Sequence, residues 1–162
     1  MRLPKSKILS RSGMPAELKN IRQAGKTVSF TNGCFDIIHS GHLEYLVFAR
    51  RQADVLVVGV NSDDSVRRNK GPGRPIIPQD ERAFILAGLE CVDYVVIFDE
   101  DEPAELVAEL VPDVLVKGKD WAHYVSGRET VEANGGKVVL ANLVEGRSTT
   151  DIARRIADAG RK

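Results

Sequence analysis

The chain has 162 residues, of which 43% are hydrophobic and 28% are charged. This length and composition suit one globular domain and exclude a disordered or fibrous chain. Lysine and arginine together number 23, as do aspartate and glutamate, so the formal net charge is +0. Because no overall field attracts nucleic acid or an anionic membrane, we expect neither as a partner, and any anion site has to be local.

The two cysteines, Cys34 and Cys91, are far apart in a chain that shows no secretory signal. Such a pair is typical of reduced thiols in a reducing compartment. The N-terminal residues 1–13 are polar and basic, and no segment is apolar over a membrane-spanning length. We therefore expect a cytoplasmic protein.

Short β-branched runs alternate with amphipathic stretches along the chain, which is typical of a parallel sheet with crossover helices. The pattern predicts an α/β fold, a single Rossmann-like doubly wound domain with a five-stranded parallel sheet. An N-terminal extension with a helix, residues 1–25, precedes the main domain, residues 26–162. The strands are expected at Thr27–Thr31, Val55–Val60, Tyr94–Phe98, Val114–Val116 and Lys137–Leu140. The helices are expected at Pro15–Gln23, Leu43–Gln52, Gln79–Leu89, Pro103–Leu110, Gly127–Asn134 and Ser148–Ala159.

Glycine and proline are dense in the stretch from Asn69 to Pro75, which predicts a loop in the middle of the domain. Two cations of this stretch, Lys70 and Arg74, are candidates for binding phosphates as the loop closes. They are equally compatible with ordinary solvated surface charges. The sequence leaves both interpretations open.

The expected first strand is followed by His39-Ser40-Gly41-His42, which leads directly into a helix. In doubly wound folds the ligand lies beyond the carboxyl ends of the strands. A helix start offers unpaired backbone N–H groups and a partial positive charge, and both favour phosphate. The two imidazoles are three positions apart, so both can point at one ligand, while Gly41 allows close approach. We predict that His39 and His42 are donors that stabilise the charge developing when the α-phosphorus of a nucleoside triphosphate is attacked.

The whole run from Phe30 to His42 closely resembles the cytidylyltransferase-like nucleotidyltransferases, which share an HxGH motif. Further segments resemble one branch, the bacterial D-glycero-β-D-manno-heptose 1-phosphate adenylyltransferases, found as free proteins or fused behind a sugar kinase domain. The resemblance covers nearly the whole chain after Lys26. The supporting stretches are Val60–Val66, Lys70–Pro75 with Asp80–Arg82, Val116–Asp120 and Ala133–Val139.

The C-terminal run from Glu145 to Ile152 resembles the Ser-Thr-Thr signature of the same family. Ser148 is a candidate helix cap, and Thr149 and Thr150 add hydroxyl donors beside the triphosphate. In the glycerol-phosphate cytidylyltransferase branch an arginine stands five residues before that serine. Here the position is Leu143, and the enzymes of the heptose branch also lack that arginine. Arg147 is an alternative cation.

The resemblance implies direct adenylyl transfer from ATP to a sugar 1-phosphate, with Mg²⁺ on the phosphates, no metal site made of protein side chains, and a homodimer. It assigns catalysis to His39 and His42. The implied nucleotide-binding residues are Asn32, Gly33, Phe35, Gly41, Lys70, Arg74, Ser148, Thr149 and Thr150. The implied substrate-binding residues are Asp36, Asn61, Lys117, Gly118 and Asp120.

Several alternatives remain open at this point. One keeps the chemistry but uses CTP with glycerol 3-phosphate or ethanolamine phosphate, and Leu143 argues against it. Another is a nucleotide-binding module without catalysis, against which the intact histidine pair argues. Individual residues also have structural interpretations: Cys34 as a small buried residue, Asp36 as a turn former, Trp121 as a cover for the core and His123 as a surface residue.

Overall fold

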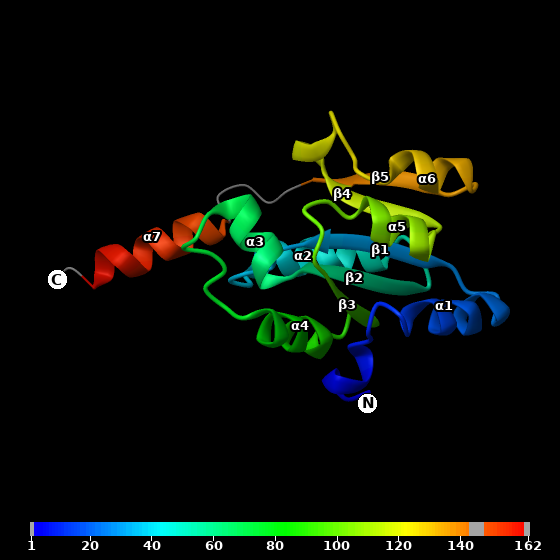
Figure 1. Cartoon of the computed structure of the whole chain (residues 1–162), viewed down its shortest axis with the longest axis horizontal. Coiled ribbons are helices and arrows are strands. Elements are labelled where there is room, and N and C mark those ends of the chain that lie inside the picture. The colour runs from blue at the N-terminus through cyan, green and yellow to red at the C-terminus, as the bar shows by residue number, and fades with distance from the viewer. Residues whose placement is uncertain (1, 143–147, 161–162) are drawn as a thin grey trace.

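A single parallel sheet forms the centre of the protein in the computed structural model, which describes residues 2–142 and 148–160 (Figure 1). The strand order is β3-β2-β1-β4-β5, and every neighbouring pair is parallel. This arrangement confirms the predicted five-stranded Rossmann-like sheet. The strands are β1 (Val28–Gly33), β2 (Val55–Asn61), β3 (Tyr94–Phe98), β4 (Val114–Gly118) and β5 (Lys137–Ala141).

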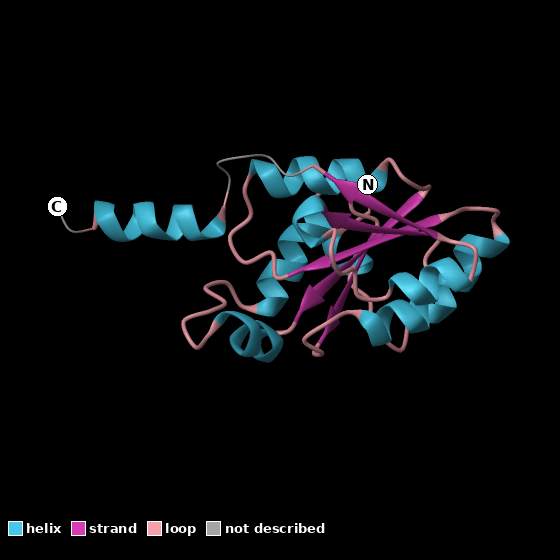
Figure 2. Ribbon diagram, turned by 90° about the horizontal axis from the view of Figure 1, so that it is seen from above, coloured by secondary structure: helices cyan, strands magenta, loops and turns pink. Residues whose placement is uncertain are grey.

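Helices cover both faces of the sheet, as Figure 2 shows. One hydrophobic cluster joins the sheet to α1 (Met14–Gln23), α5 (Ala104–Leu110) and α6 (Arg128–Ala133). A second cluster on the opposite face joins it to α2 (Ser40–Arg50) and α4 (Gln79–Gly88). Because both faces are buried, β2, β3 and β4 consist largely of apolar residues, and the polar Ser29 and Thr31 of β1 are buried as well.

The last helix, α7 (Thr149–Ala159), extends away from the sheet in both views (Figures 1 and 2). None of its side chains is buried against the described part of the chain. Only its first turn approaches the body of the protein. Among residues 2–142 and 148–160, no helix is long and apolar enough to cross a membrane.

The α-helix α3 (Asp63–Lys70) was not predicted from the sequence. The expected loop from Asn69 to Pro75 is therefore wrong at its first two residues, which lie in the last turn of α3. Ser62 caps this helix by accepting a hydrogen bond from the Ser65 N–H at 3.0 Å. Acidic residues in its first turn and basic residues in its last turn complement the helix dipole, and these features stabilise a short and very polar helix.

The N-terminal segment is tied to the sheet rather than lying free. A short 3-10 helix, η1 (Pro4–Lys7), places the Lys7 ammonium on the carbonyls of Leu89 and Val92, at 3.1 and 2.8 Å. Ile8 then pairs with Val95 of β3 in a parallel bridge. The proposed boundary between residues 1–25 and 26–162 stays a prediction.

The strand order places the point of reversal between β1 and β4. The chain winds outward from β1 through β2 to β3 and then crosses back to β4 on the other side of β1. At such a point the loops that leave the two central strands turn in opposite directions and open a crevice at their carboxyl ends. The fold therefore puts the candidate site beyond Gly33 of β1 and Gly118 of β4.

The centre of β2 has room only for a glycine. A Cβ atom on Gly59 would lie 2.9 Å from Cζ of Phe30 and 3.2 Å from Cβ of Asn32. We predict that Gly59→Ala lowers the free energy of unfolding by about 1–3 kcal/mol, because the buried Phe30 ring has to move. Denaturant unfolding measures this. Gly88→Ala is the matched control, since nothing lies within 4 Å of its added methyl group, and equal stability of the two variants would contradict the prediction.

Candidate active site

A cavity of about 800 Å³ opens at the carboxyl ends of β1, β2 and β4. It is bordered by the β1–α2 turn, the end of α3, the segment before α5, the η2 turn (Lys119–Trp121) and the start of α7. All candidate site residues identified in the sequence line this one cavity. They are Asn32, Gly33, Phe35, Asp36, His39, Gly41, His42, Asn61, Lys70, Arg74, Lys117, Gly118, Asp120, Ser148, Thr149 and Thr150.

The turn after β1 stacks the two histidines on each other. His39 is the N-cap of α2 in an extended conformation, and His42 lies in the first helical turn. Their ring centroids are 3.9 Å apart, and the Phe35 and His42 rings form an edge-to-face pair with centroids 5.5 Å apart. Phe35 has a φ of 49°, a strained conformation for a residue with a side chain. Its ring leaves little space for a side chain at Gly33, because a Cβ there would be 3.1 Å from the ring.

His42 is a neutral donor toward the cavity. Burial, together with the neighbouring His39, lowers its pKa to about 4. Its Nδ1 atom accepts the backbone N–H of His39 at 3.4 Å, so the ring proton of the neutral form lies on Nε2. His42 thus offers an N–H group at a helix start while its ring stays uncharged.

Two helix N-termini meet at the cavity. α2 begins at Ser40, and α7 begins at Thr149. Ser148 caps α7 by accepting the N–H of Asp151 at 3.0 Å, and the Thr149 hydroxyl donates to the Ile37 carbonyl at 3.3 Å. This contact joins the start of α7 to the segment that precedes α2. Free N–H groups and positive dipole ends from both helices favour an anion between them.

Asp36 fastens the glycine- and proline-rich segment to the β1–α2 turn. Its carboxylate accepts the Arg74 guanidinium at 2.7 Å and the backbone N–H groups of Ile76 and Ile77 at 2.8 and 2.9 Å. Burial opposes ionisation, but the hydrogen bonds from Ile77, Arg74 and Ile76 outweigh it and lower the pKa of Asp36. The carboxylate is therefore occupied within the protein, and Arg74 is held at the cavity rather than extended into solvent.

Arg82 of α4 is fully buried and joins three segments that build the site. Its guanidinium donates to the main-chain carbonyls of Cys34, Asn61 (2.8 Å) and Ile77 (2.9 Å). It also pairs with the Asp63 carboxylate at 2.9 Å. Removing one partner from a buried charge network costs about 3–5 kcal/mol in other proteins, so these contacts strongly constrain the turn after β1.

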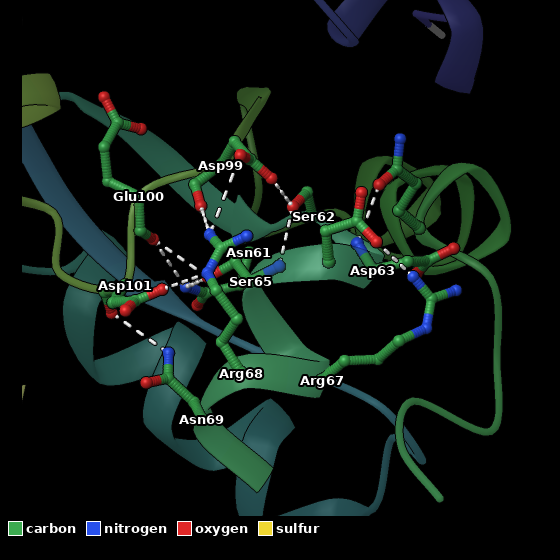
Figure 3. A network of polar contacts seen from close by, with 12 residues as sticks. Asn61, Ser62, Asp63, Ser65, Arg67, Arg68, Asn69, Asp99, Glu100 and Asp101 are labelled. Carbon is green, nitrogen blue, oxygen red and sulfur yellow. Dashed lines mark hydrogen bonds and ion pairs between the residues drawn. The ribbon is translucent and has the colours of Figure 1, made fainter. Parts of the chain in front are cut away.

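A polar network fastens α3 to the segment after β3 (Figure 3). Asn61 donates to the Ser65 hydroxyl at 2.9 Å and to the Glu100 carbonyl at 3.5 Å. Arg68 pairs with Asp101 at 2.7 Å. The Asn61 amide is thus engaged inside the protein, and the network positions the acidic segment beside the cavity.

Lys117 at the end of β4 is a buried cation that faces the cavity. Burial lowers its pKa to about 8, and the nearby carboxylates of Asp120 and Glu102 partly offset that effect. Within the described part of the chain it makes no hydrogen bond or ion pair, and its ammonium lies 5.7 Å from the centre of the Trp121 ring. An anion bound in the cavity would therefore pair with the Lys117 ammonium, which otherwise has no ion-pair partner among the described residues. The buried Oδ1 atom of Asn32 also lacks a partner in this region and can accept a ligand donor.

The family model described as Cytidylyltransferase-like matches residues 30–155. The chain belongs to the cytidylyltransferase-like family. This finding confirms the resemblance read from the run between Phe30 and His42. The residues that line the cavity, from Asn32 to Thr150, all lie within the matched range.

Similar proteins cover most of this cytidylyltransferase-like chain. The bifunctional protein HldE of Syntrophotalea carbinolica is 56% identical over 154 residues, and that of Pelobacter propionicus is 51% identical over 154 residues. Both matches cover 94% of this chain but only 31% and 32% of the relatives, so the chain spans about a third of their length. The crystal structure of the lipopolysaccharide core biosynthesis protein from Thermoplasma volcanium matches with a TM-score of 0.61 and 27% identity, over 76% of this chain and 100% of that chain.

Some functional features were not found in the sequence. Arg82 was noted only within the stretch Asp80–Arg82 that supports the resemblance, and nothing in that stretch distinguishes a buried arginine from a surface one. Trp121 was expected to cover the core, but it is 51% exposed and lines the cavity. Cys34 was expected to be buried, but it is only partly buried and also lines the cavity. Leu143 and Arg147, considered above as an alternative cation position, lie outside the described residues.

The lowered pKa of His42 predicts how the protein responds to acid. Between pH 6.5 and about 4 the unfolded chain binds a proton at this ring and the folded chain does not. The free energy of unfolding should therefore fall as the pH decreases through this window, and it should keep the contribution of His42 in full above pH 6.5. Urea unfolding at several pH values measures the slope.

His42→Asn should make that slope shallower, because the variant lacks the titrating ring. His123→Asn is the matched control, an exposed histidine outside the cavity lining that we expect to keep the wild-type slope. A wild-type slope in His42→Asn would show that the ring is not held neutral by its surroundings.

Proposed function

We propose that the chain transfers AMP from ATP to D-glycero-β-D-manno-heptose 1-phosphate, giving ADP-heptose and pyrophosphate. The product would serve as a precursor of lipopolysaccharide or of other surface heptose. The observation that carries the proposal is the meeting of His39, His42 and two helix N-termini with the buried cation Lys117 in one cavity. The heptose-like segments and the matches to HldE proteins support the choice of acceptor.

In the proposed reaction an oxygen of the sugar 1-phosphate attacks the α-phosphorus of ATP. A new P–O bond forms, the bond between the α-phosphorus and its bridging oxygen breaks, and pyrophosphate leaves with that oxygen. Negative charge grows on the α-phosphoryl oxygens and on the leaving group. The Nε2–H of His42 and the N–H groups at the starts of α2 and α7 are donors placed for this charge.

No covalent intermediate with the protein is part of this proposal. Cys34 is the only nucleophilic thiol among the described residues that line the cavity, and burial raises its pKa. A thiol with a raised pKa carries little thiolate at neutral pH, so it is a poor nucleophile. Direct transfer instead relies on orientation of the two substrates.

The cations divide the cavity between the two substrates. Arg74 and Lys70 come from the segment around α3 and are proposed to contact the triphosphate. Lys117 is proposed to hold the attacking phosphate, with Gly118 and Asp120 beside it. Asp36 acts on this arrangement through Arg74, which it positions at 2.7 Å.

Mg²⁺ is proposed to accompany ATP. Among the described residues no group of three or more His, Cys, Asp or Glu side chains is placed to ligate a metal. Magnesium prefers waters and phosphate oxygens with few protein carboxylates, so the residues present fit an ion that arrives on the triphosphate. When bound, it would neutralise charge on the phosphate oxygens.

A cytoplasmic location and a homodimer belong to the same proposal. Exposed apolar side chains support an association between copies, notably Phe84 and Ile85 on α4 at 45% exposure each and Ile156 on α7 at 63%. Surfaces of this kind are stabilised when a partner covers them.

Pyrophosphate release in a matrix of nucleotides and phosphorylated acceptors tests the proposed function. ATP with D-glycero-β-D-manno-heptose 1-phosphate should give the highest kcat/KM.

His42→Ala should lower kcat by about 10²–10³-fold, because a transition-state donor is lost, while the free energy of unfolding at pH 7.5 changes little. Gly88→Ala lies outside the cavity lining, so it is the control and should retain wild-type turnover.

The alternatives give different results in the same matrix. Equal or faster turnover of CTP with glycerol 3-phosphate or ethanolamine phosphate would remove the heptose assignment. Binding of ATP without pyrophosphate release from any acceptor would favour the non-catalytic module. Near-normal kcat of His42→Ala would remove the proposed role of that histidine.

A further inference from the structure

We infer that the η2 side of the cavity is a sugar subsite, in which Trp121 and Tyr124 form an aromatic platform and the carboxylates of Glu102 and Asp120 recognise hydroxyl groups. The inference rests on the proposed function and deepens it. It assigns recognition of the polyhydroxylated ring to side chains outside the HxGH and Ser-Thr-Thr motifs.

The aromatic side chains are exposed at the place where a ligand would contact them. Trp121 and Tyr124 are each 51% exposed, and both line the cavity. Trp121 is the only tryptophan of the chain. The C–H face of a pyranose ring is apolar, and an exposed aromatic face can pack against it while the ring hydroxyls stay hydrogen-bonded.

Lys117 fixes where the phosphate of such a sugar would lie. Its ammonium is 5.7 Å from the centre of the Trp121 ring and has no ion pair among the described residues. A phosphate bound to this ammonium places the sugar attached to it within reach of the indole. Lys117 therefore links the phosphate position to the aromatic platform.

The lining of the cavity carries charges of both signs. His39, His42, Lys70 and the starts of α2 and α7 provide donors and positive potential. The lining also contains the carboxylates of Asp101, Glu102 and Asp120, and the last two interact with the Lys117 ammonium. Carboxylates repel a polyphosphate but accept hydrogen bonds from neutral hydroxyls, so the uncharged part of the acceptor is favoured beside them.

Hydrogen bonds and an ion pair hold two of these three carboxylates in place. Tyr124 donates its hydroxyl to Glu102 at 2.7 Å, which joins the η2 side to the segment before α5. Asp101 pairs with Arg68 at 2.7 Å and is engaged by the α3 network. Asp120 makes no hydrogen bond with the residues that the structure describes, so its oxygens remain for a ligand.

The single tryptophan makes the subsite directly observable. Titration of the wild-type protein with D-glycero-β-D-manno-heptose 1-phosphate should change the Trp121 fluorescence in a saturable way. Titration with inorganic phosphate at equal concentrations should have a much smaller effect, since it lacks the sugar ring. This binding readout does not require turnover.

Variants of Trp121 then test how much its ring contributes to recognition of the sugar phosphate. Trp121→Ala should raise the KM for the sugar phosphate by about tenfold and leave the KM for ATP unchanged, as expected for loss of one aromatic contact. Trp121→Phe should recover most of that loss, because it restores an aromatic face. Phe84→Ala is the matched control, an exposed aromatic residue of α4 that does not line the cavity.

The outcomes separate this inference from the proposed function. Turnover of the heptose phosphate with an unchanged sugar-phosphate KM in Trp121→Ala would overturn the subsite and leave the proposed function standing. A saturable fluorescence response without turnover of any sugar phosphate would support the subsite and remove the proposed function. An equal rise of both KM values in Trp121→Ala would also overturn the subsite, because it indicates a general disturbance of the cavity.

Discussion

One buried guanidinium connects the parts of the chain from which the cavity is built. Arg82 donates to the turn after β1, to the end of β2 and to the segment beyond the glycine- and proline-rich stretch. A charge with no solvent exposure is tolerated only when every donor finds an acceptor, so each of these segments is confined to one position. The placement of the histidines therefore depends on a residue that does not contact the ligand.

Other contacts extend the same constraint around the rim. Asp36 holds Arg74 and the two peptide N–H groups that follow, while the α3 network holds the acidic segment after β3. Tyr45 connects the two central strands, because its hydroxyl donates to the Val116 carbonyl of β4 and accepts a bond from Thr31 of β1. Preorganised donors act on a transition state without reorganising, and rigid borders of this kind provide that condition.

The sequence predicted the parts of the structure that depend on local pattern. Alternating β-branched runs and amphipathic stretches gave the sheet, and the spacing of His39 and His42 before a helix gave the cavity. α3 was missed because it contains almost no apolar residue, so no hydrophobic period marks it, although the Ser62 cap was a usable signal.

Burial and long-range contacts could not be predicted from the local sequence pattern. Arg82 looks like any helical arginine until the strands bring three carbonyls around it. Trp121 was interpreted as a cover for the core, but it is 51% exposed, because it lies in the short η2 turn beyond β4, which the sequence pattern did not indicate. Asp36 was interpreted as a sugar ligand or a turn former, and its partner Arg74 lies in a segment whose path local pattern does not determine.

The proposed chemistry requires the reactive phosphorus of ATP to lie between two helix starts and the His42 ring. A crystal structure with a non-hydrolysable ATP analogue tests this most directly. We predict that an α-phosphoryl oxygen lies within hydrogen-bond distance of Nε2 of His42, with the polyphosphate directed toward the first turns of α2 and α7. A polyphosphate bound elsewhere, with both imidazoles turned away from it, would contradict the proposed function.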